Sequence, residues 1–125
     1  SCIAIGWGDT MRKDAKNNNP ITRTHSYLLQ EALLPITDCP ENVQNSTFRN
    51  MICANPINER AICDGDSGGP LMCKTESTEA REYRQFGITK SIQTLESACY
   101  FETAFFTDVA FQSEWINKTL TSFSS

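Results

Sequence analysis

Six cysteines set the strongest constraint on what this chain can fold into. They stand at positions 2, 39, 53, 63, 73 and 99 of a 125-residue sequence. No two of them form a Cys-x-x-Cys pair, the spacing typical of zinc and redox sites. An even number of cysteines in a short chain favours disulfides, which persist in oxidising compartments. The cysteines therefore predict a secreted domain that is stabilised by disulfides.

Other features of the sequence fit the secretory route. Asn45-Ser46-Thr47 and Asn117-Lys118-Thr119 match the acceptor pattern for N-glycosylation. The chain begins Ser1-Cys2-Ile3, without the Met, basic segment and apolar run of a signal peptide. We therefore expect a processed piece of a longer precursor, with N-glycans at Asn45 and Asn117.

The composition indicates one folded domain, residues 1–125. Hydrophobic residues make up 39% of the chain and charged residues 21%, as in ordinary globular proteins. The net charge of -4 excludes a sequence-independent nucleic-acid binder and does not suit an anionic membrane surface. No apolar run approaches the roughly 20 residues that span a bilayer, so a membrane partner is not expected.

Short β-branched and aromatic runs between turn-rich segments predict an all-β domain. Residues 9–20 and 75–81 have the polar composition of exposed loops. One amphipathic helix is expected over 108–120, where Val109, Trp115, Ile116 and Leu120 would share an apolar stripe that packs on the domain. The predicted strands are 2–7, 25–34, 48–54, 70–74, 83–91 and 104–109.

The chemically informative stretch is Cys63-Asp64-Gly65-Asp66-Ser67-Gly68-Gly69-Pro70. A serine becomes an acyl-transfer nucleophile when a tight turn holds its hydroxyl beside a base and backbone N–H groups point at the developing oxyanion. Glycines at 65, 68 and 69 lack the Cβ atoms that would crowd such a turn. A glycine-rich turn without chemistry is the alternative interpretation.

Other landmarks agree with a catalytic turn. Cys2 lies four residues before Gly6-Trp7-Gly8, and Cys73 lies six residues after Ser67. With Met51-Ile52-Cys53-Ala54, Gln30 to Pro35 and Phe105 to Ile116, these positions closely resemble the chymotrypsin-like serine proteases from Cys2 to Ile116. The resemblance covers only the second half of that family's two-barrel architecture.

The resemblance implies an antiparallel six-stranded Greek-key β-barrel, the second barrel of the family, with a C-terminal α-helix. Six cysteines can pair in fifteen ways. Of these, the resemblance selects Cys2–Cys73, Cys39–Cys53 and Cys63–Cys99.

The resemblance also assigns roles within the turn. Ser67 would be the nucleophile, and the N–H groups of Gly65 and Ser67 would form the oxyanion hole. Asp66 would pair with the new N-terminal amine that zymogen activation creates. This chemistry requires no metal ion and no organic cofactor.

The expected substrate pocket departs from the family pattern at its floor. The residue six before the nucleophile is Ala61, followed by Ile62, where an aspartate would select Lys or Arg through a buried charge pair. Asp64 resembles a residue of the pocket entrance. A preference for basic side chains is therefore disfavoured.

The pocket walls depart as well. The family's Ser-Trp-Gly strand aligns without gaps to Lys90-Ser91-Ile92 or, with one inserted residue, to Ser91-Ile92-Gln93. The other wall glycine aligns with Ala104. These changes imply a shallow, mostly apolar pocket for a small side chain, or no working pocket.

The triad is incomplete in this sequence, because the family's first barrel carries the general base and the aspartate that orients it. His25, the only histidine, lies in Thr24-His25-Ser26, far from the family's Ala-Ala-His-Cys context, so we expect it on the surface or packed in a loop. A serine without a base is a poor nucleophile, and the chain alone is not expected to hydrolyse peptides.

Three functions remain open from the sequence. The leading one is the second-barrel chain of a secreted two-chain serine endopeptidase, whose N-terminal barrel chain supplies His and Asp and which meets protein or peptide substrates and protein inhibitors. Lys90 and the altered pocket walls motivate the second, a catalytically silent binding module or cofactor. The third, an autonomous structural or inhibitory protein, is disfavoured because half a protease would expose a large apolar face.

Overall fold

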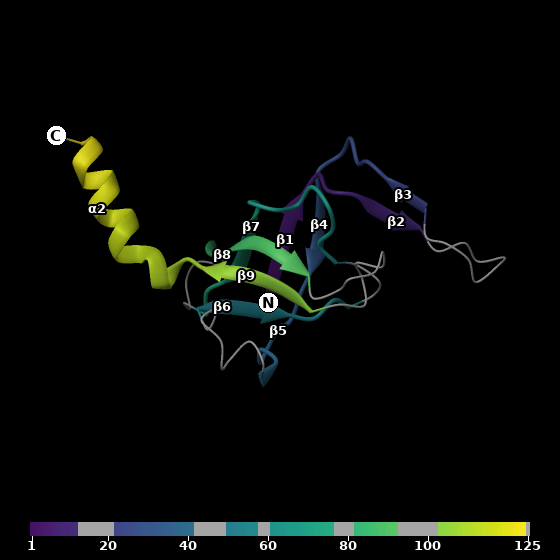
Figure 1. Ribbon diagram of the computed structural model, residues 1–125, viewed down its shortest axis with the longest axis horizontal. Helices are drawn as coiled ribbons and strands as arrows, with labels where there is room; N and C mark the ends of the chain where they lie inside the picture. Colours follow the sequence, from purple (N-terminus) through teal and green to yellow (C-terminus); the bar gives the residue numbers. More distant parts are fainter. Residues whose placement is uncertain (13–21, 42–49, 58–60, 77–81, 93–102, 125) are drawn as a thin grey trace.

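The computed structural model describes residues 1–12, 22–41, 50–57, 61–76, 82–92 and 103–124 (Figure 1). Within them lie nine β-strands, one 3-10 helix and one α-helix. Seven of the strands form one antiparallel sheet in the order β4-β1-β7-β8-β9-β6-β5, while β2 and β3 pair separately. The strands are β1 (Cys2–Gly6), β2 (Thr10–Arg12), β3 (Thr22–Thr24), β4 (Gln30–Leu33), β5 (Ile36–Thr37), β6 (Met51–Ala54), β7 (Pro70–Lys74), β8 (Tyr83–Ile92) and β9 (Ala104–Asp108), and the helices are η2 (Ala110–Gln112) and α2 (Ser113–Phe123).

The sheet curls into a barrel because its two edge strands belong to one segment of the chain. Only Leu34 and Pro35 separate β4, at one edge, from β5, at the other. Across this junction the Leu34 N–H donates to the Cys2 carbonyl at 3.0 Å, and the Asn55 N–H donates to the Pro35 carbonyl at 3.1 Å. If β4 and β5 are counted as one bent strand, the described sheet is the expected antiparallel six-stranded barrel.

The core lies inside this curl and follows the strand alternation. Leu34, Leu71 and Phe106 are each fully buried. Gly87 lies against them, since a Cβ there would stand 2.9 Å from the Phe106 Cβ. Each inward side chain is followed by a more exposed one along β7, as expected for a strand with one face in the core.

Two of the three expected disulfides are confirmed. Cys2 and Cys73 face each other on β1 and β7, and their sulfur atoms are bonded. Cys39 and Cys53 form the second bridge. Cys63 is disulfide-bonded as well, and its expected partner, Cys99, lies outside the described residues.

Most strand predictions are confirmed within a few residues, and 70–74 matches β7 at both ends. The prediction of a strand over 25–34 is wrong in its first half, because residues 26–29 form a bend that nearby side chains hold before β4 begins at Gln30. The Ser26 hydroxyl donates to the Leu28 carbonyl at 2.6 Å, and the Gln30 amide donates to the same carbonyl at 3.3 Å. Local side-chain hydrogen bonds of this kind compete with a strand ladder.

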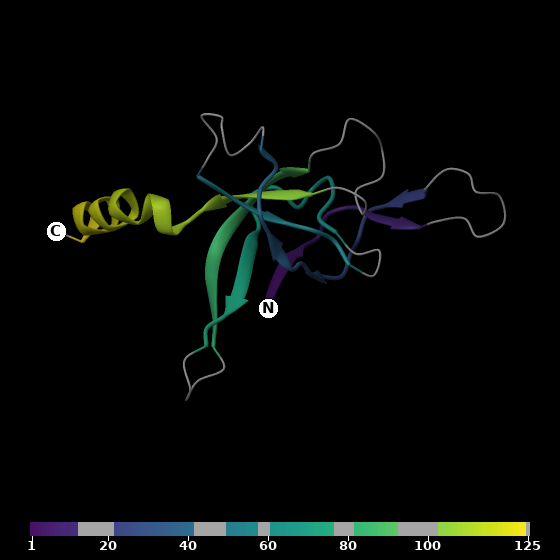
Figure 2. The ribbon, with the colours of Figure 1, turned by 90° about the horizontal axis from the view of Figure 1, so that it is seen from below.

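The loop prediction for 9–20 is wrong at its start. Residues 10–12 form β2, which pairs with β3 so that Thr10 stands opposite Thr24. The sequence pattern does not predict this pairing, because the segment is charged and its partner strand follows only after residues 13–21. Those residues lie outside the described part of the chain. Figure 2 shows β2 and β3 leaving the barrel on the side opposite to α2.

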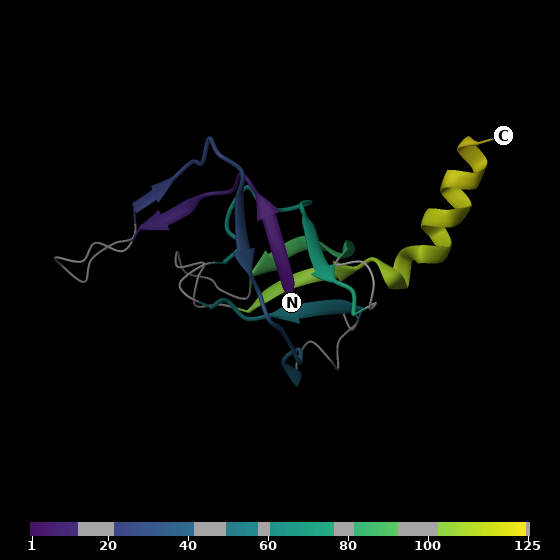
Figure 3. The same cartoon turned by 180° about the vertical axis from the view of Figure 1, so that it is seen from behind.

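The C-terminal helix is confirmed, but its expected packing on the domain is wrong. It begins at Ser113, after η2, and projects away from the barrel, as Figure 3 shows. None of its residues is buried, and Trp115, Leu120 and Phe123 are 66%, 61% and 83% exposed. Of the four residues of the predicted apolar stripe, Trp115, Ile116 and Leu120 lie on α2, and Trp115 and Leu120 face solvent. The prediction is wrong for Val109, which precedes η2 and lies outside the α-helix. No helix among the described residues is long and apolar enough to cross a membrane.

Candidate active site

Ser67 lies in a tight double turn between Cys63 and the start of β7. The Asp66 N–H donates to the Cys63 carbonyl, and the Gly69 N–H donates to the Asp66 carbonyl, both at 3.0 Å. Gly65 and Gly68 adopt φ angles of 96° and 85°, a left-handed conformation that favours glycine. The expected crowding of a Cβ is confirmed at Gly69, where it would stand 2.9 Å from the Ile5 carbonyl oxygen, and at Gly65, where it would stand 3.1 Å from the Gly8 Cα. At Gly68 that reason is wrong, because no atom lies within 4 Å of a Cβ there, and the left-handed backbone is what favours glycine.

β8 holds the far side of this turn. The Gly68 N–H donates to the Thr89 carbonyl at 2.9 Å, and the Thr89 N–H donates to the Gly69 carbonyl at 2.8 Å. The Ser67 side chain remains exposed, with its hydroxyl 3.5 Å from the Lys90 carbonyl. The backbone beyond the serine is therefore fixed, while the hydroxyl itself faces solvent.

The N–H groups expected in the oxyanion hole lie in the same turn. Within the described part of the chain, neither the Gly65 N–H nor the Ser67 N–H donates a hydrogen bond. Oxyanion stabilisation requires donors that are held by the backbone and not used elsewhere. Both groups meet that requirement here.

The Asp66 carboxylate joins the Ser67 turn to the end of β1. One oxygen accepts the Gly8 N–H at 2.8 Å, and the other accepts the Cys63 N–H at 2.9 Å. A Cβ on either Gly6 or Gly8 would overlap the Asp66 carboxyl group. Sequence reasoning used these two glycines only as a landmark, and the structure shows that they make room for this carboxylate.

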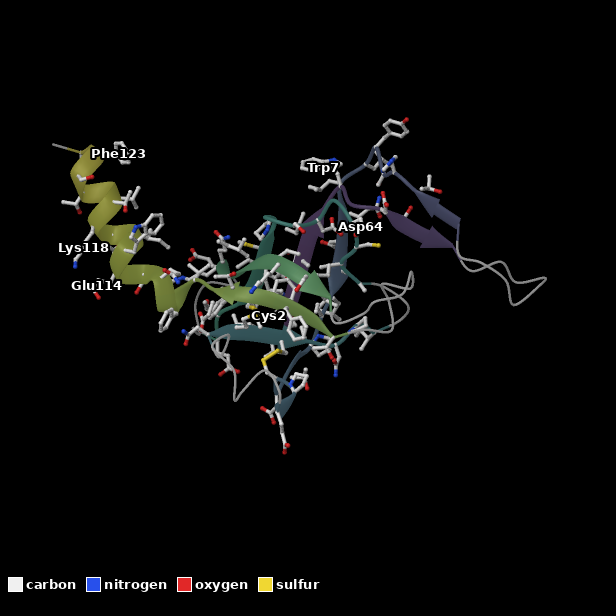
Figure 4. All side chains as sticks on the ribbon, viewed as in Figure 1. Cys2, Trp7, Asp64, Glu114, Lys118 and Phe123 are labelled. Atoms are coloured by element: carbon white, nitrogen blue, oxygen red, sulfur yellow. A yellow bond between two sulfur atoms is a disulfide. The ribbon has the colours of Figure 1, made fainter. Side chains whose placement is uncertain are left out.

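A second connection joins the same two segments. The Asp9 N–H donates to the Asp64 carbonyl at 2.7 Å. The Asp9 carboxylate in turn lies 2.7 Å from Nδ1 of His25, whose side chain is 91% exposed, whereas that of Asp9 is 12% exposed. The exposed position agrees with the surface role expected for His25, whereas its contact with Asp9 is not predictable from the sequence pattern. Figure 4 shows Trp7 and Asp64 at the end of the barrel near β2 and β3.

The predicted pocket residues divide into a buried and an exposed group. Ile62 is 4% exposed and Ala104 is fully buried, and both belong to the apolar core. Ala61 is partly buried, while Asp64, Lys90 and Ser91 are exposed.

β8 and β9 bring two of the predicted wall residues together. Ile92 stands opposite Ala104, and Ser91 stands opposite Phe105, after a register shift between Thr89 and Ser91. The alternative alignment ends at position 93, outside the described residues. The roles of these residues in binding remain predictions.

Sequence reasoning missed Thr89. Its side chain is 4% exposed, and its hydroxyl has no hydrogen-bond partner in the described structure. Alternation along β8 could have found it, because Thr89 is two residues from the inward-facing Gly87.

Of the two predicted glycosylation sites, Asn117 is exposed on α2, and Asn45 lies outside the described residues.

Comparison with known proteins agrees with this geometry. Chymotrypsin-like elastase family member 1 from Bos taurus is 32% identical over 97% of this chain and 42% of its own length. The human protein of the same name is 32% identical over 97% of this chain and 44% of its own length. Human chymotrypsin-like elastase family member 3B is 31% identical over 97% of this chain and 42% of its own length. The chain thus spans less than half the length of these relatives. The model of the trypsin family matches residues 1–116, from β1 into α2, and the chain therefore belongs to the trypsin family.

Proposed function

We propose that this chain is the second-barrel part of a secreted serine endopeptidase, with Ser67 as its nucleophile. The observation that carries the proposal is the Ser67 turn. It combines an exposed hydroxyl with two N–H groups that make no hydrogen bond within the described residues, and Asp66 fastens it to β1. A turn with no chemical role would not need this combination.

In the proposed reaction, Ser67 Oγ attacks the carbonyl carbon of the scissile peptide bond. Its proton passes to a histidine of the first-barrel part, which an aspartate of that part orients. The Gly65 and Ser67 N–H groups donate to the oxyanion. The histidine returns the proton to the leaving amine, and water then hydrolyses the acyl-enzyme and restores the serine.

The exposed apolar surface supports a first-barrel partner. Tyr27 and Leu28 are 95% and 75% exposed, and three large side chains of α2 face solvent. Clustered apolar groups on a surface are typical of an interface. The relatives are more than twice as long as this chain, so a partner that covers these side chains would come from the same precursor. The same exposure disfavours an autonomous protein.

The proposed substrates are proteins or peptides with a small or apolar side chain before the scissile bond. β7 pairs with β8 only as far as Ile88, so Ser91 and Ile92 extend past it beside the Ser67 turn, where an extended substrate backbone can lie. No acid occupies the floor position, which is Ala61. The burial of Ile62 and Ala104 leaves little depth for a long side chain.

Secretion and N-glycosylation belong to the same proposal. The two described disulfides need an oxidising compartment to persist. The exposed position of Asn117 on α2 leaves its side chain accessible to a glycan.

Hydrolysis by the complete two-chain protein tests the proposal. Peptide substrates that differ only in the residue before the scissile bond, Ala, Val, Phe or Arg, would be compared at equal concentration. We expect turnover of the Ala and Val peptides, little of the Arg peptide, and none with Ser67→Ala. Absence of turnover on every peptide by protein that is folded and proteolytically activated would contradict the proposal.

A catalytically silent binding module is the second candidate. It is favoured by the weak hydrogen bond that the Ser67 hydroxyl makes to the Lys90 carbonyl and by the buried pocket residues. The sequence of the partner chain separates the two candidates. A partner that lacks either the histidine or the aspartate of the triad supports the silent module, and a partner that contains both supports the endopeptidase.

A further inference from the structure

We propose that Asp9 and His25 are positioning residues for the oxyanion hole. They would hold the Asp64–Gly65 peptide so that the Gly65 N–H faces the developing oxyanion. This inference rests on the proposed function, because it concerns the same Ser67 turn. It assigns a role to the one histidine in the sequence and to its acidic partner, neither of which belongs to the triad.

The first step follows from the geometry of the peptide bond. The Asp9 N–H donates to the Asp64 carbonyl at 2.7 Å. No cis peptide bond occurs in the described residues, and in a trans peptide the C=O and the following N–H point in opposite directions within one plane. The hydrogen bond from Asp9 therefore fixes the direction of the Gly65 N–H.

The second step is that this peptide needs such a tether. Gly65 is exposed and adopts a φ of 96°, and glycine has more backbone freedom than any other residue. Its own N–H makes no hydrogen bond within the described part of the chain. A rotation of the peptide would turn the N–H away from the oxyanion, and the bond from Asp9 opposes that rotation.

The third step is that Asp9 is held in place by its surroundings. Its neighbour Gly8 donates to the Asp66 carboxylate at 2.8 Å. Its own carboxylate lies 2.7 Å from Nδ1 of His25, which directly follows β3. Because β2 and β3 pair from Thr10 and Thr24 onward, the Asp9–His25 contact closes the base of that hairpin. The hairpin thus fixes the backbone that carries the Asp9 N–H.

Neither residue would touch the substrate, so the expected effect falls on the transition state. Loss of the contact leaves substrate binding unchanged and weakens oxyanion stabilisation, which lowers kcat and spares KM. Removal of a whole oxyanion donor costs about 100-fold to 1000-fold in kcat. A donor that is only less well aligned should cost less, about tenfold.

The experiment uses the complete, activated two-chain protein with a peptide substrate that has Ala before the scissile bond. Three variants test the contact: Asp9→Ala and His25→Ala remove it, and His25→Asn keeps an N–H donor near the position of Nδ1. Glu114→Ala is the control, since it removes a different acid–base contact, the exposed 2.9 Å pair with Lys118 on α2. In Figure 4 this pair lies on the far side of the barrel from Asp64.

We expect Asp9→Ala and His25→Ala to lower kcat about tenfold with KM within twofold of the parent, and His25→Asn to recover most of the loss. Asp9→Ala and His25→Ala should also slow the reaction of Ser67 with a fluorophosphonate. Glu114→Ala should change neither. If Asp9→Ala does not fold, the kcat of His25→Ala tests the inference. The His25 side chain is almost fully exposed, so its removal should leave the fold intact.

Parent-like kcat in His25→Ala, or a loss that His25→Asn does not recover, would overturn the inference. A parent protein that neither turns over substrate nor reacts with the fluorophosphonate would instead overturn the proposed function. The two failures are therefore distinguishable.

Discussion

The Asp66 carboxylate accepts a hydrogen bond from the Gly8 N–H at 2.8 Å, across 58 residues of sequence. This bond fastens the turn that presents Ser67 to the end of β1. Because the carboxylate is partly buried and accepts a second N–H from Cys63 at 2.9 Å, both of its oxygens are used. The shape of the turn therefore depends on Gly8, which lies near the N-terminus and far from the turn in the sequence.

Replacement of Gly8 by Ala should destabilise the fold. The new Cβ would overlap the Asp66 carboxyl group, so the carboxylate must move and lose the Gly8 N–H. We expect a loss of about 1–3 kcal/mol in the free energy of unfolding. Urea unfolding under oxidising conditions measures it.

Gly68→Ala is the comparison for that variant. No atom lies within 4 Å of a Cβ at position 68, so its cost comes only from the left-handed backbone, about 1–2 kcal/mol. If Gly8→Ala is as stable as the parent, the described contact between Gly8 and Asp66 is not required for stability.

The substitution Asp66→Asn should also weaken the fold. An amide nitrogen cannot accept a hydrogen bond, so one of the N–H groups of Gly8 and Cys63 would lose its acceptor. An unsatisfied buried donor costs about 1–3 kcal/mol. Thermal unfolding followed by circular dichroism checks this, with Asp38→Asn, at an exposed aspartate, as control. Equal losses in the two variants would contradict the structural role of Asp66.

The two described disulfides should differ in what they contribute. Cys2–Cys73 closes a separation of 71 residues, and Cys39–Cys53 closes one of 14. In the chain-entropy model the longer loop restricts the unfolded chain more, so the paired substitution of Cys2 and Cys73 by Ser should cost more than that of Cys39 and Cys53, within a range of about 2–5 kcal/mol. Unfolding curves of the two double variants test the order, and the reverse order would show that native-state packing outweighs chain entropy.

The apolar face of α2 should drive association of the isolated chain. Replacement of Trp115, Leu120 and Phe123 by Gln removes three large exposed side chains and should lower the apparent mass in sedimentation. The melting temperature should change little, because no residue of α2 is buried. Glu114→Ala and Thr121→Ala on the polar face serve as controls. Unchanged association, or a barrel that melts early, would show that the face has another role.

The sequence predicted the parts of the fold that depend on local pattern or on family resemblance. The strand 70–74 and the crowded glycine positions 65 and 69 belong to this group. The pairing of Cys2 with Cys73 came from the resemblance alone.

What the sequence did not predict depends on distant partners. The hairpin of β2 and β3 joins residues on either side of a charged segment, and the Asp9–His25 contact follows from that pairing. The spacing of apolar residues predicts the apolar stripe of α2, but this spacing does not show which part of the protein covers the stripe. The need for glycine at 6 and 8 appears only when the Asp66 carboxylate is placed against them.

The most direct test of the central claim is reaction of the complete, activated two-chain protein with a fluorophosphonate, followed by mass spectrometry of the peptide that contains residue 67. The account predicts one adduct, on Ser67, which is absent in Ser67→Ala and absent when this chain is treated without its partner. Failure of the folded and activated two-chain protein to form an adduct at Ser67 would contradict it.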